Sequence, residues 1–375
     1  MPPLQPPSSH AAALPQRVLG ATGIRTPALG VGCWAIGGPA TNLGLPMGWD
    51  SGADTDSARD GLMQAYTLGA RLFDTADVYG LGRSERLIGE LVAEVGREQL
   101  VLVSKVGYFP GTAAHGYSPG HMRRQLEQSL ENLSTDHLDV YFLHHNDFGP
   151  DDRYLNDAVE QMRTFKRDGL VRAIGMRGPH LHALERLDPN RPPGQAAPRF
   201  ADLIDRVAPD VLAVRDNLLT PAVRSSRIYR MAAERGIGIL INKPLAQGLL
   251  TGTHHPHAPR VFGDADHRRR KRWFTPNALE LIQRGLDDVR TVIGPDPAEL
   301  VRFALWHCLK ASDQAIALCG FTSPAQVRTN LTCLAREPDP AALEQVRRIM
   351  ADTQQRLDAQ GAVFRDAPAP AAETR

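Results

Sequence analysis

Eight short apolar segments, spread along the middle of the chain, constrain its fold more than any other feature. They are rich in Val, Ile and Leu and alternate little with polar residues, as strands buried on both faces of a sheet do. The segments span residues 28–33, 71–74, 100–106, 138–144, 171–176, 211–215, 238–242 and 315–320. Buried parallel strands need helices on their outer faces, so a repeated strand–helix alternation is expected.

Amphipathic segments between the strands fit that expectation. Residues 56–68 have a helical apolar pattern followed by a glycine. A second helix is predicted to begin with Ser118 as N-cap and Pro119 at the first helical position. Similar patterns around 159–165 and 226–235 are also followed by glycine, which commonly ends helices.

Eight alternations are compatible with a closed barrel or with an open, doubly wound sheet. A dinucleotide-binding open sheet carries G-x-G-x-x-G after a strand, and the glycine-rich stretch 30–38 has a different spacing. We therefore predict an α/β protein with one (β/α)8 TIM barrel over residues 17–360. The proline-rich ends, 1–16 and 361–375, are predicted to be a disordered arm and tail.

Composition excludes several classes of protein. With 43 basic and 42 acidic side chains, the chain lacks the charge excess of a nucleic-acid or membrane-surface protein. It has no signal-peptide pattern at its start and no apolar run of the roughly 20 residues needed to span a bilayer. None of the four cysteines forms a C-x-x-C pair, and HHPH at 254–257 lacks ligand-like partners. We expect a cytoplasmic protein without a metal site.

Four residues with useful chemistry follow the predicted strands, and active groups of a barrel lie at the carboxyl ends of its strands. Asp74 ends the second strand, Tyr79 follows it, Lys105 lies at the end of the third and His144 closes the fourth. A free tyrosine, with a pKa of about 10, is a weak acid, but a nearby ammonium favours its phenolate. A carboxylate can hold the lysine, and a histidine can hydrogen-bond a substrate carbonyl.

The segments that carry these residues resemble the aldo-keto reductase family. The similar stretches are FDTADVYGLGRSERLIGE (73–90), VSKVG (103–107), TDHLDVYFLHH (135–145), DGLVRAIG (168–175), KPLAQGLLTG (243–252) and GFTSPAQVRTNL (320–331). The resemblance implies that Asp74, Tyr79, Lys105 and His144 form a catalytic tetrad. It also implies an N-terminal β-hairpin, within residues 17–32, that closes the barrel floor.

The resemblance implies a nicotinamide cofactor, generally NADP. Two groups of residues match the positions that contact it, one in a pyrophosphate loop and one at the adenosine phosphate. These residues are Pro244, Leu245 and Gly248, and then Thr322, Gln326 and Asn330. Gln326 stands where many members have an arginine for the 2′-phosphate, so NAD stays open as an alternative.

The chain departs from the family around the nicotinamide ring. Arg177 and Gly178 stand in place of a Ser-Asn pair, and Ala213 in place of a glutamine. The aromatic residue that stacks on the ring is replaced by Asn242, followed by Lys243. Either backbone groups or Arg177 are expected to replace the missing amide contact, and Arg177 is taken as a cofactor-binding residue. The alternative is that no nicotinamide is held there.

Other residues allow two readings. His145 neighbours His144, but alternation along a strand turns their side chains in opposite directions, and His144 is favoured for the pocket. Trp34 and Trp273 are predicted to flank the barrel mouth, where they either shape the substrate pocket or pack the loops. The run HRRRKR at 267–272 is either a solvated loop face or a segment that folds over the entrance and attracts a phosphate.

The sequence thus predicts an NAD(P)H-dependent oxidoreductase that reduces a small carbonyl compound (aldehyde, ketone or sugar-like), or runs the reverse reaction, with Tyr79 as general acid. The alternative is a redox-neutral dehydratase, isomerase or cyclase that uses the same tetrad. A third hypothesis is a cofactor-sensing subunit without catalysis. Substrate choice depends on loops such as 38–52 and 253–275, whose shapes the sequence does not give.

Overall fold

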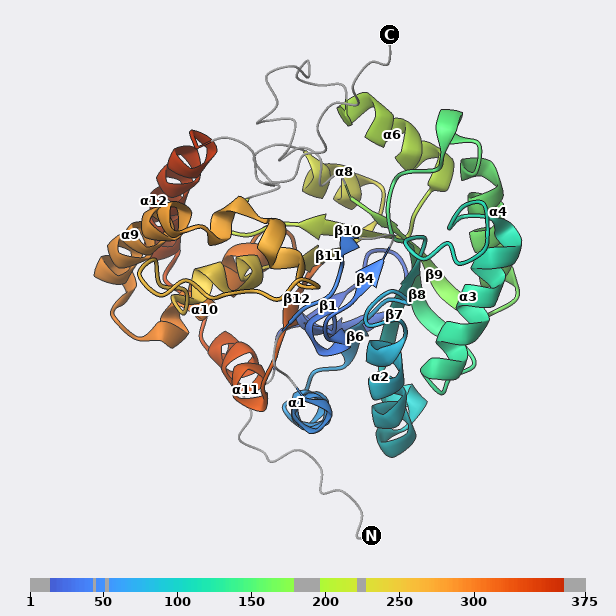
Figure 1. Ribbon diagram of the computed structural model, residues 1–375, viewed down its shortest axis with the longest axis horizontal. Coiled ribbons are helices and arrows are strands. Elements are labelled where there is room, and N and C mark those ends of the chain that lie inside the picture. The colour runs from blue at the N-terminus through green and yellow to red at the C-terminus, as the bar shows by residue number, and fades with distance from the viewer. Residues whose placement is uncertain (1–13, 43–44, 51–53, 179–195, 221–226, 361–375) are drawn as a thin grey trace.

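The computed structural model describes residues 14–42, 45–50, 54–178, 196–220 and 227–360. Eight parallel strands close into a barrel with the order β10-β11-β12-β3-β6-β7-β8-β9, surrounded by helices (Figure 1). The strands are β3 (Leu29–Gly32), β6 (Leu72–Asp74), β7 (Val101–Val106), β8 (Leu138–Leu143), β9 (Val171–Arg177), β10 (Val211–Arg215), β11 (Gly238–Asn242) and β12 (Ala315–Gly320). The predicted TIM barrel and all eight predicted strands are confirmed. Almost all of the predicted arm, and the whole tail, lie outside the described residues.

A hairpin of β1 (Gln16–Val18) and β2 (Arg25–Pro27) precedes the barrel, as the resemblance implied. Its turn closes the floor, because the side chain of Leu19 is fully buried and the amide of Ala21 donates to the carbonyl of Gly236 at 2.7 Å. A second small hairpin, β4 (Thr41–Asn42) with β5 (Leu45–Pro46), lies in the loop after β3.

The helices occupy the positions between strands where the apolar patterns placed them. They are α1 (Thr55–Thr67), α2 (Arg83–Val95), α3 (Pro119–Asn132), α4 (Leu155–Arg167), α6 (Ala196–Val207), α8 (Ile228–Glu234), α9 (Pro276–Ile293), α10 (Pro297–Leu309), α11 (Pro324–Thr332) and α12 (Pro340–Asp358). Ser118 is the N-cap of α3 and Pro119 opens the helix as predicted, although the Ser118 side chain makes no capping hydrogen bond. Among the described helices, none is long and apolar enough to cross a membrane.

The barrel interior is filled by apolar side chains, among them Val103, Val140, Phe142, Leu240 and Ile316. A β-carbon on Gly175 would lie 2.5 Å from the ring of Phe142, so the glycine makes room for the largest of these side chains. A separate apolar cluster lies outside the barrel among the residues of α9, α10 and α12. These three helices are on the left in Figure 1.

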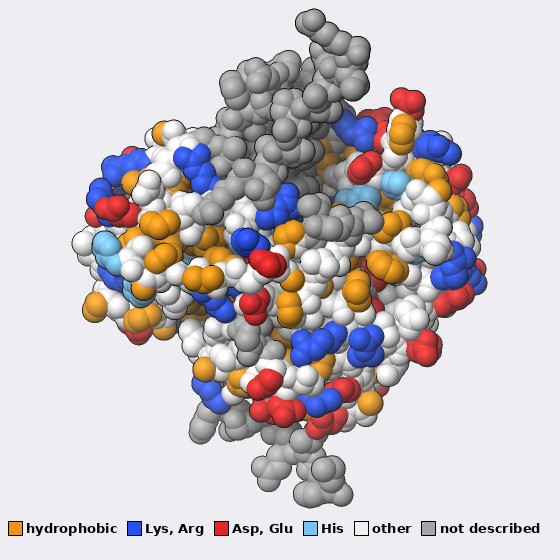
Figure 2. Space-filling view, viewed as in Figure 1, with side chains coloured by type: hydrophobic (Ala, Val, Ile, Leu, Met, Phe, Trp, Pro, Cys, Tyr) orange, Lys and Arg blue, Asp and Glu red, His pale blue; other side chains and the backbone are white. Residues whose placement is uncertain are grey.

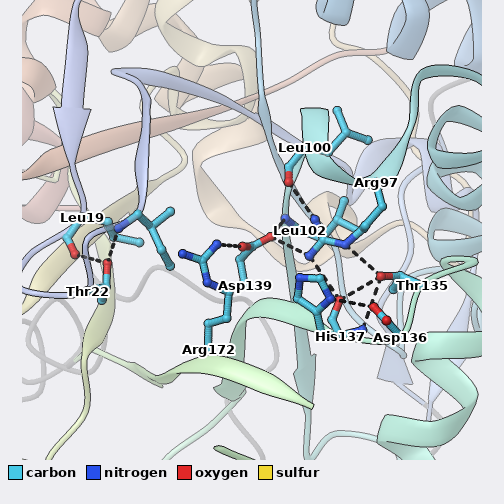
Figure 3. A network of polar contacts seen from close by, with 11 residues as sticks. Leu19, Thr22, Arg97, Leu100, Leu102, Thr135, Asp136, His137, Asp139 and Arg172 are labelled. Carbon is cyan, nitrogen blue, oxygen red and sulfur yellow. Dashed lines mark hydrogen bonds and ion pairs between the residues drawn. The ribbon is translucent and has the colours of Figure 1, made fainter. Parts of the chain in front are cut away.

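An ion network lies at the amino-terminal end of the strands, at the opposite end of β8 from His144. The carboxylate of Asp139, near the start of β8, is 1% exposed and accepts hydrogen bonds from Arg97 at 2.7 Å and Arg172 at 2.6 Å (Figure 3). The amide of Leu102 donates to the same carboxylate at 2.9 Å. Because the buried charge is paired on both oxygens, removing either partner would leave an uncompensated charge inside the protein.

Candidate active site

The four residues of the predicted tetrad come together at the carboxyl ends of neighbouring strands. Asp74 is the last residue of β6, Lys105 lies near the end of β7, and His144 follows β8. Tyr79 lies in the loop between β6 and α2. This loop is pressed against Gly37, since a β-carbon there would lie 2.8 Å from the carbonyl carbon of Tyr79, and this close approach fixes the tyrosine.

The Lys105 ammonium is the centre of the site. It donates to Oδ1 of Asp74 at 2.8 Å and to the backbone oxygen of Thr75 at 2.5 Å. Its remaining contact is the Tyr79 phenolic oxygen, at 3.4 Å. Burial by itself lowers the pKa of Lys105, but Asp74 and Tyr79 together raise it above its usual value. The lysine therefore stays a cation at neutral pH and faces the tyrosine.

Tyr79 is a protonated phenol at neutral pH. Burial raises its pKa above the ordinary value, and the neighbouring charge of Lys105 offsets this only in part. The sequence suggested the lowering effect of the lysine, but the burial that outweighs it follows from the closed loop. A protonated phenol held next to an ammonium can give a proton to a substrate and be stabilised as phenolate afterwards.

His144 lies on the other side of Tyr79, with their ring centroids 5.8 Å apart. It is buried, and its Nδ1 has no hydrogen-bond partner within the described residues. Burial first, and then the charges of Lys105 and Arg177, hold the pKa of His144 well below its ordinary range, so its ring is neutral. His145 turns toward Tyr117 instead, at 4.6 Å between centroids, in keeping with the expected alternation.

The two predicted tryptophans lie in different surroundings. Trp34 stacks on Tyr79 with centroids 6.2 Å apart, and its indole donates to the backbone oxygen of Met47 at 2.8 Å. It therefore forms a wall of the site. Trp273 is 8% exposed and belongs to the apolar cluster under α9 and α10 with Phe274, so the structure places it among packing residues.

Arg177 lies beside the tetrad at the end of β9. Its guanidinium donates to the hydroxyl of Tyr108 at 2.6 Å and to the backbone oxygen of His144 at 3.4 Å. The Tyr108 ring in turn contacts the His144 ring, with centroids 4.7 Å apart. Tyr108 escaped notice in the sequence because it follows the end of β7 without a recognisable motif.

The residues predicted to contact the cofactor phosphates lie in two places, the loop after β11 and the start of α11. Pro244, Leu245 and Gly248 lie after β11, where the short helix η4 (Ala246–Thr251) has positive φ angles at Ala246, Gln247 and Gly248. Within this turn the amides of Ala246 and Gly248 donate to the backbone oxygens of Lys243 and Leu245, at 2.9 and 3.0 Å.

The residues predicted to contact the adenosine phosphate, Thr322, Gln326 and Asn330, lie in and just before α11. Oε1 of Gln326 accepts hydrogen bonds from the amide and the hydroxyl of Thr322, at 2.8 and 3.1 Å. Asn330 donates to the backbone oxygen of Gly320 at 3.4 Å. Ser323, which the sequence argument missed, is the N-cap of α11. These residues fit the phosphate end of a dinucleotide, because a helix N-terminus with a hydroxyl favours anions.

Three cations near the mouth were not selected as site residues from the sequence. Arg215 is the last residue of β10, Lys243 follows β11, and Lys271 joins the short helices η5 (His267–Arg270) and η6 (Arg272–Phe274). The strand-end criterion that selected Asp74 would also have found Arg215. Among the described residues, no three His, Cys, Asp or Glu side chains gather closely enough to hold a metal ion. On the face of the molecule seen in Figure 2, basic and acidic side chains are intermingled.

Active groups at the carboxyl ends of the strands are typical of (β/α)8-barrel enzymes, and Asp, Tyr, Lys and His gather at that end here. The sequence matches the profile of the Aldo/keto reductase family over residues 28–351, and the chain belongs to this family. It is 28% identical over 331 residues to the NADH-specific methylglyoxal reductase of Escherichia coli (strain K12), covering 84% of this chain and 92% of that protein.

Two further similarities agree with this assignment. The L-glyceraldehyde 3-phosphate reductase of the same organism is 25% identical over 328 residues, covering 85% of this chain and 87% of that protein. Among solved structures, a glycerol dehydrogenase from Gluconobacter oxydans matches with a TM-score of 0.69 at 21% identity, covering 96% of this chain and 98% of that one. The structural likeness supports the barrel fold.

Proposed function

We propose that this protein is an NAD(P)H-dependent carbonyl reductase in which Tyr79 is the general acid. The observation that carries the proposal is the position of the Lys105 ammonium, 2.8 Å from Asp74 and 3.4 Å from the Tyr79 oxygen. The relatives described above are named as reductases, which supports carbonyl reduction as the reaction class.

Each residue of the tetrad has a defined task. When bound, the reduced nicotinamide supplies the hydride for the carbonyl carbon. Tyr79 gives its proton to the carbonyl oxygen, and Lys105 stabilises the phenolate that remains. Asp74 holds the lysine in place. His144, as a neutral ring, donates a hydrogen bond that orients the carbonyl before reaction.

We propose that the cofactor is held by the loop after β11 and the start of α11, and that NADH is accepted as well as NADPH. Gln326 carries no charge to bind a 2′-phosphate, and its Oε1 is directed at Thr322. One relative is named as NADH-specific. Arg177 lies where a contact to the nicotinamide end is expected, next to His144.

The experiment is a pair of measurements on the purified protein. The protein is titrated with NADPH and with NADH, and nucleotide fluorescence and the melting temperature of the protein are measured at each concentration. These signals determine which nucleotide binds. Consumption of the bound nucleotide with methylglyoxal and other aldehydes then measures reduction. Tyr79→Phe is expected to lower kcat by about 10²–10⁴-fold with nucleotide binding retained. Tyr66→Phe, on the outer helix α1, is the matched control and is expected to behave as the unmodified protein. Near-normal turnover by Tyr79→Phe would exclude the mechanism.

The second candidate is redox-neutral acid–base catalysis by the same tetrad. It is favoured by one observation: Ala213 and Gly178 offer no side-chain amide at the nicotinamide end, since Gly178 uses its backbone amide to bond Ala213 at 2.8 Å. Strict coupling of product formation to nucleotide oxidation would exclude it. Product formed in the absence of nucleotide would favour it over reduction.

A further inference from the structure

Four basic side chains converge beside the tetrad, three of them from the ends of adjacent strands. Arg177 ends β9, Arg215 ends β10 and Lys243 follows β11, and these strands are neighbours in the barrel. Lys271 reaches the same place from the long segment after β11. We refer to these four residues as the cation cluster.

The charges of the cluster lie close enough to act on one another. The Lys243 and Lys271 amino groups lie within hydrogen-bonding reach of each other. Burial lowers the pKa of both lysines well below the ordinary value, and the charge of Arg215 lowers both further. Burial and the charge of Arg177 also lower the pKa of Arg215 to about 10. His267, in η5, faces the two lysines as well.

No Asp or Glu of the described part of the chain forms an ion pair with the cluster. Lys271 is only 3% exposed, and Nε of Arg215 is buried without a hydrogen-bond partner. Elsewhere the fold pairs its buried cations: Arg268, 3% exposed as well, binds the carboxylate of Asp266 at 2.7 Å. Burying unpaired charge is costly, and Lys271 is buried while the other three members are partly exposed, so the cluster is suited to binding an anion.

The cluster is connected to the tetrad on both sides. The Lys243 ammonium lies 5.0 Å from the ring of Trp34, the residue that stacks on Tyr79. On the other side, Arg177 bonds Tyr108, whose ring packs against His144. One small substrate could therefore place its anionic group at the cluster and its carbonyl group at Tyr79.

We propose that the cation cluster binds an anionic group of the substrate, a carboxylate or a phosphate, so that the enzyme prefers acidic aldehydes or ketones over neutral ones. The inference rests on the proposed reductase function and narrows its substrate class. Guanidinium groups bind such oxyanions through paired hydrogen bonds, and lysines add point charges. Because burial lowers the pKa of both lysines, an anion bound beside them is expected to raise that pKa and so to favour proton uptake.

The direct test needs no turnover. Succinate and inorganic phosphate are titrated into the protein without nucleotide by calorimetry in two buffers of different ionisation enthalpy. Binding with net proton uptake is expected for the unmodified protein. Lys243→Met and Lys271→Met are expected to weaken that binding by about 10-fold or more, the typical effect of removing a charged hydrogen bond. Arg230→Met, which removes an exposed cation from α8, is the control and should bind as before.

A kinetic test compares 4-oxobutanoate with butanal, which lacks the carboxylate. The unmodified enzyme is expected to favour 4-oxobutanoate by about 10-fold or more in kcat/KM, mainly through a lower KM. In Lys243→Met and Lys271→Met the ratio of the two kcat/KM values is expected to fall toward one, and in Arg230→Met it should not change.

The outcomes separate this inference from the reductase proposal. Equal reduction of both aldehydes, with no binding of succinate or phosphate, would overturn the anion site and leave the reductase intact. Succinate binding that depends on Lys271, without any aldehyde reduction, would support the anion site and refute the reductase. If the lysine variants lost only nucleotide affinity, with the aldehyde preference unchanged, the cluster would belong to the cofactor diphosphate and the inference would be wrong.

Discussion

The Lys105 ammonium lies 3.4 Å from the phenolic oxygen of Tyr79 and 4.8 Å from the centre of its ring. The lysine thus contacts the tyrosine at the atom that would lose a proton. Burial still keeps the pKa of Tyr79 above its ordinary value, so in the proposed mechanism the lysine would stabilise the phenolate once it forms.

Replacement of Lys105 separates catalysis from stability. Lys105→Met is expected to lower kcat by about 10²–10⁴-fold, because the phenolate loses its cation. It also leaves the buried carboxylate of Asp74 unpaired, at a cost of about 3–5 kcal/mol in unfolding free energy. Lys105→Met combined with Asp74→Asn should recover much of the stability, measured by urea unfolding, but none of the activity. Recovery of activity in the double variant would contradict the role given to Lys105.

His144 is expected to remain neutral throughout the physiological pH range. Burial and the neighbouring cations lower its pKa well below the ordinary value of about 6.5. In a proton NMR titration its ring signals should therefore not shift between pH 6 and 8. A titration midpoint within that range would mean that the ring is an imidazolium during part of the reaction, and that it acts as a second acid.

Replacement of Gln326 tests the cofactor site. The side chain is exposed at the start of α11 and its oxygen bonds Thr322 at 2.8 Å. Gln326→Arg places a cation there and is expected to shift the ratio of NADPH to NADH affinity toward NADPH by about 10-fold. Gln326→Met, which loses the bond to Thr322 without adding charge, is the control. An unchanged ratio in Gln326→Arg would place the 2′-phosphate elsewhere.

The ion network at the barrel floor should be structural and independent of the active site. Asp139→Ala leaves Arg97 and Arg172 without their shared carboxylate and is expected to cost about 3–5 kcal/mol in unfolding free energy. Asp168→Ala, which removes an exposed ion pair with Arg123, should cost less than about 1 kcal/mol. Nucleotide affinity should be unchanged in both, and a loss of affinity in Asp139→Ala would contradict a purely structural role.

The strand-end residues could be predicted from the sequence because parallel strands bring their carboxyl ends to one rim. Asp74 and His144 are of this kind, and Tyr79 follows within a short loop. Lys271 lies in the run 267–272, for which a solvated face and a segment over the entrance both stayed open. The sequence could not decide between them, because the path of this long segment depends on tertiary packing. The direction of the pKa shift of Tyr79 could not be predicted from the sequence either, since it depends on how completely the loops exclude water.

The unpaired charge of Lys271 leads to a prediction about stability. Its pKa is lowered on folding, so the unfolded chain binds more protons than the folded one between that lowered pKa and about 10.4. The free energy of unfolding therefore rises with pH through this window. Below the window, the charge of Lys271 lowers the free energy of unfolding.

Lys271→Met keeps a similar side-chain volume, removes one charge and relieves the repulsion on Lys243. Without ligand, the variant is expected to have a larger free energy of unfolding than the unmodified protein at pH 7, with a weaker dependence on pH between 7 and 9. Added phosphate should narrow the difference, because it stabilises only the protein that binds it. Urea unfolding at pH 7, 8 and 9 measures both effects. If Lys271→Met were less stable than the unmodified protein at pH 7, Lys271 would have a favourable contact in the folded chain. The proposal that the cluster binds an anion would then be contradicted.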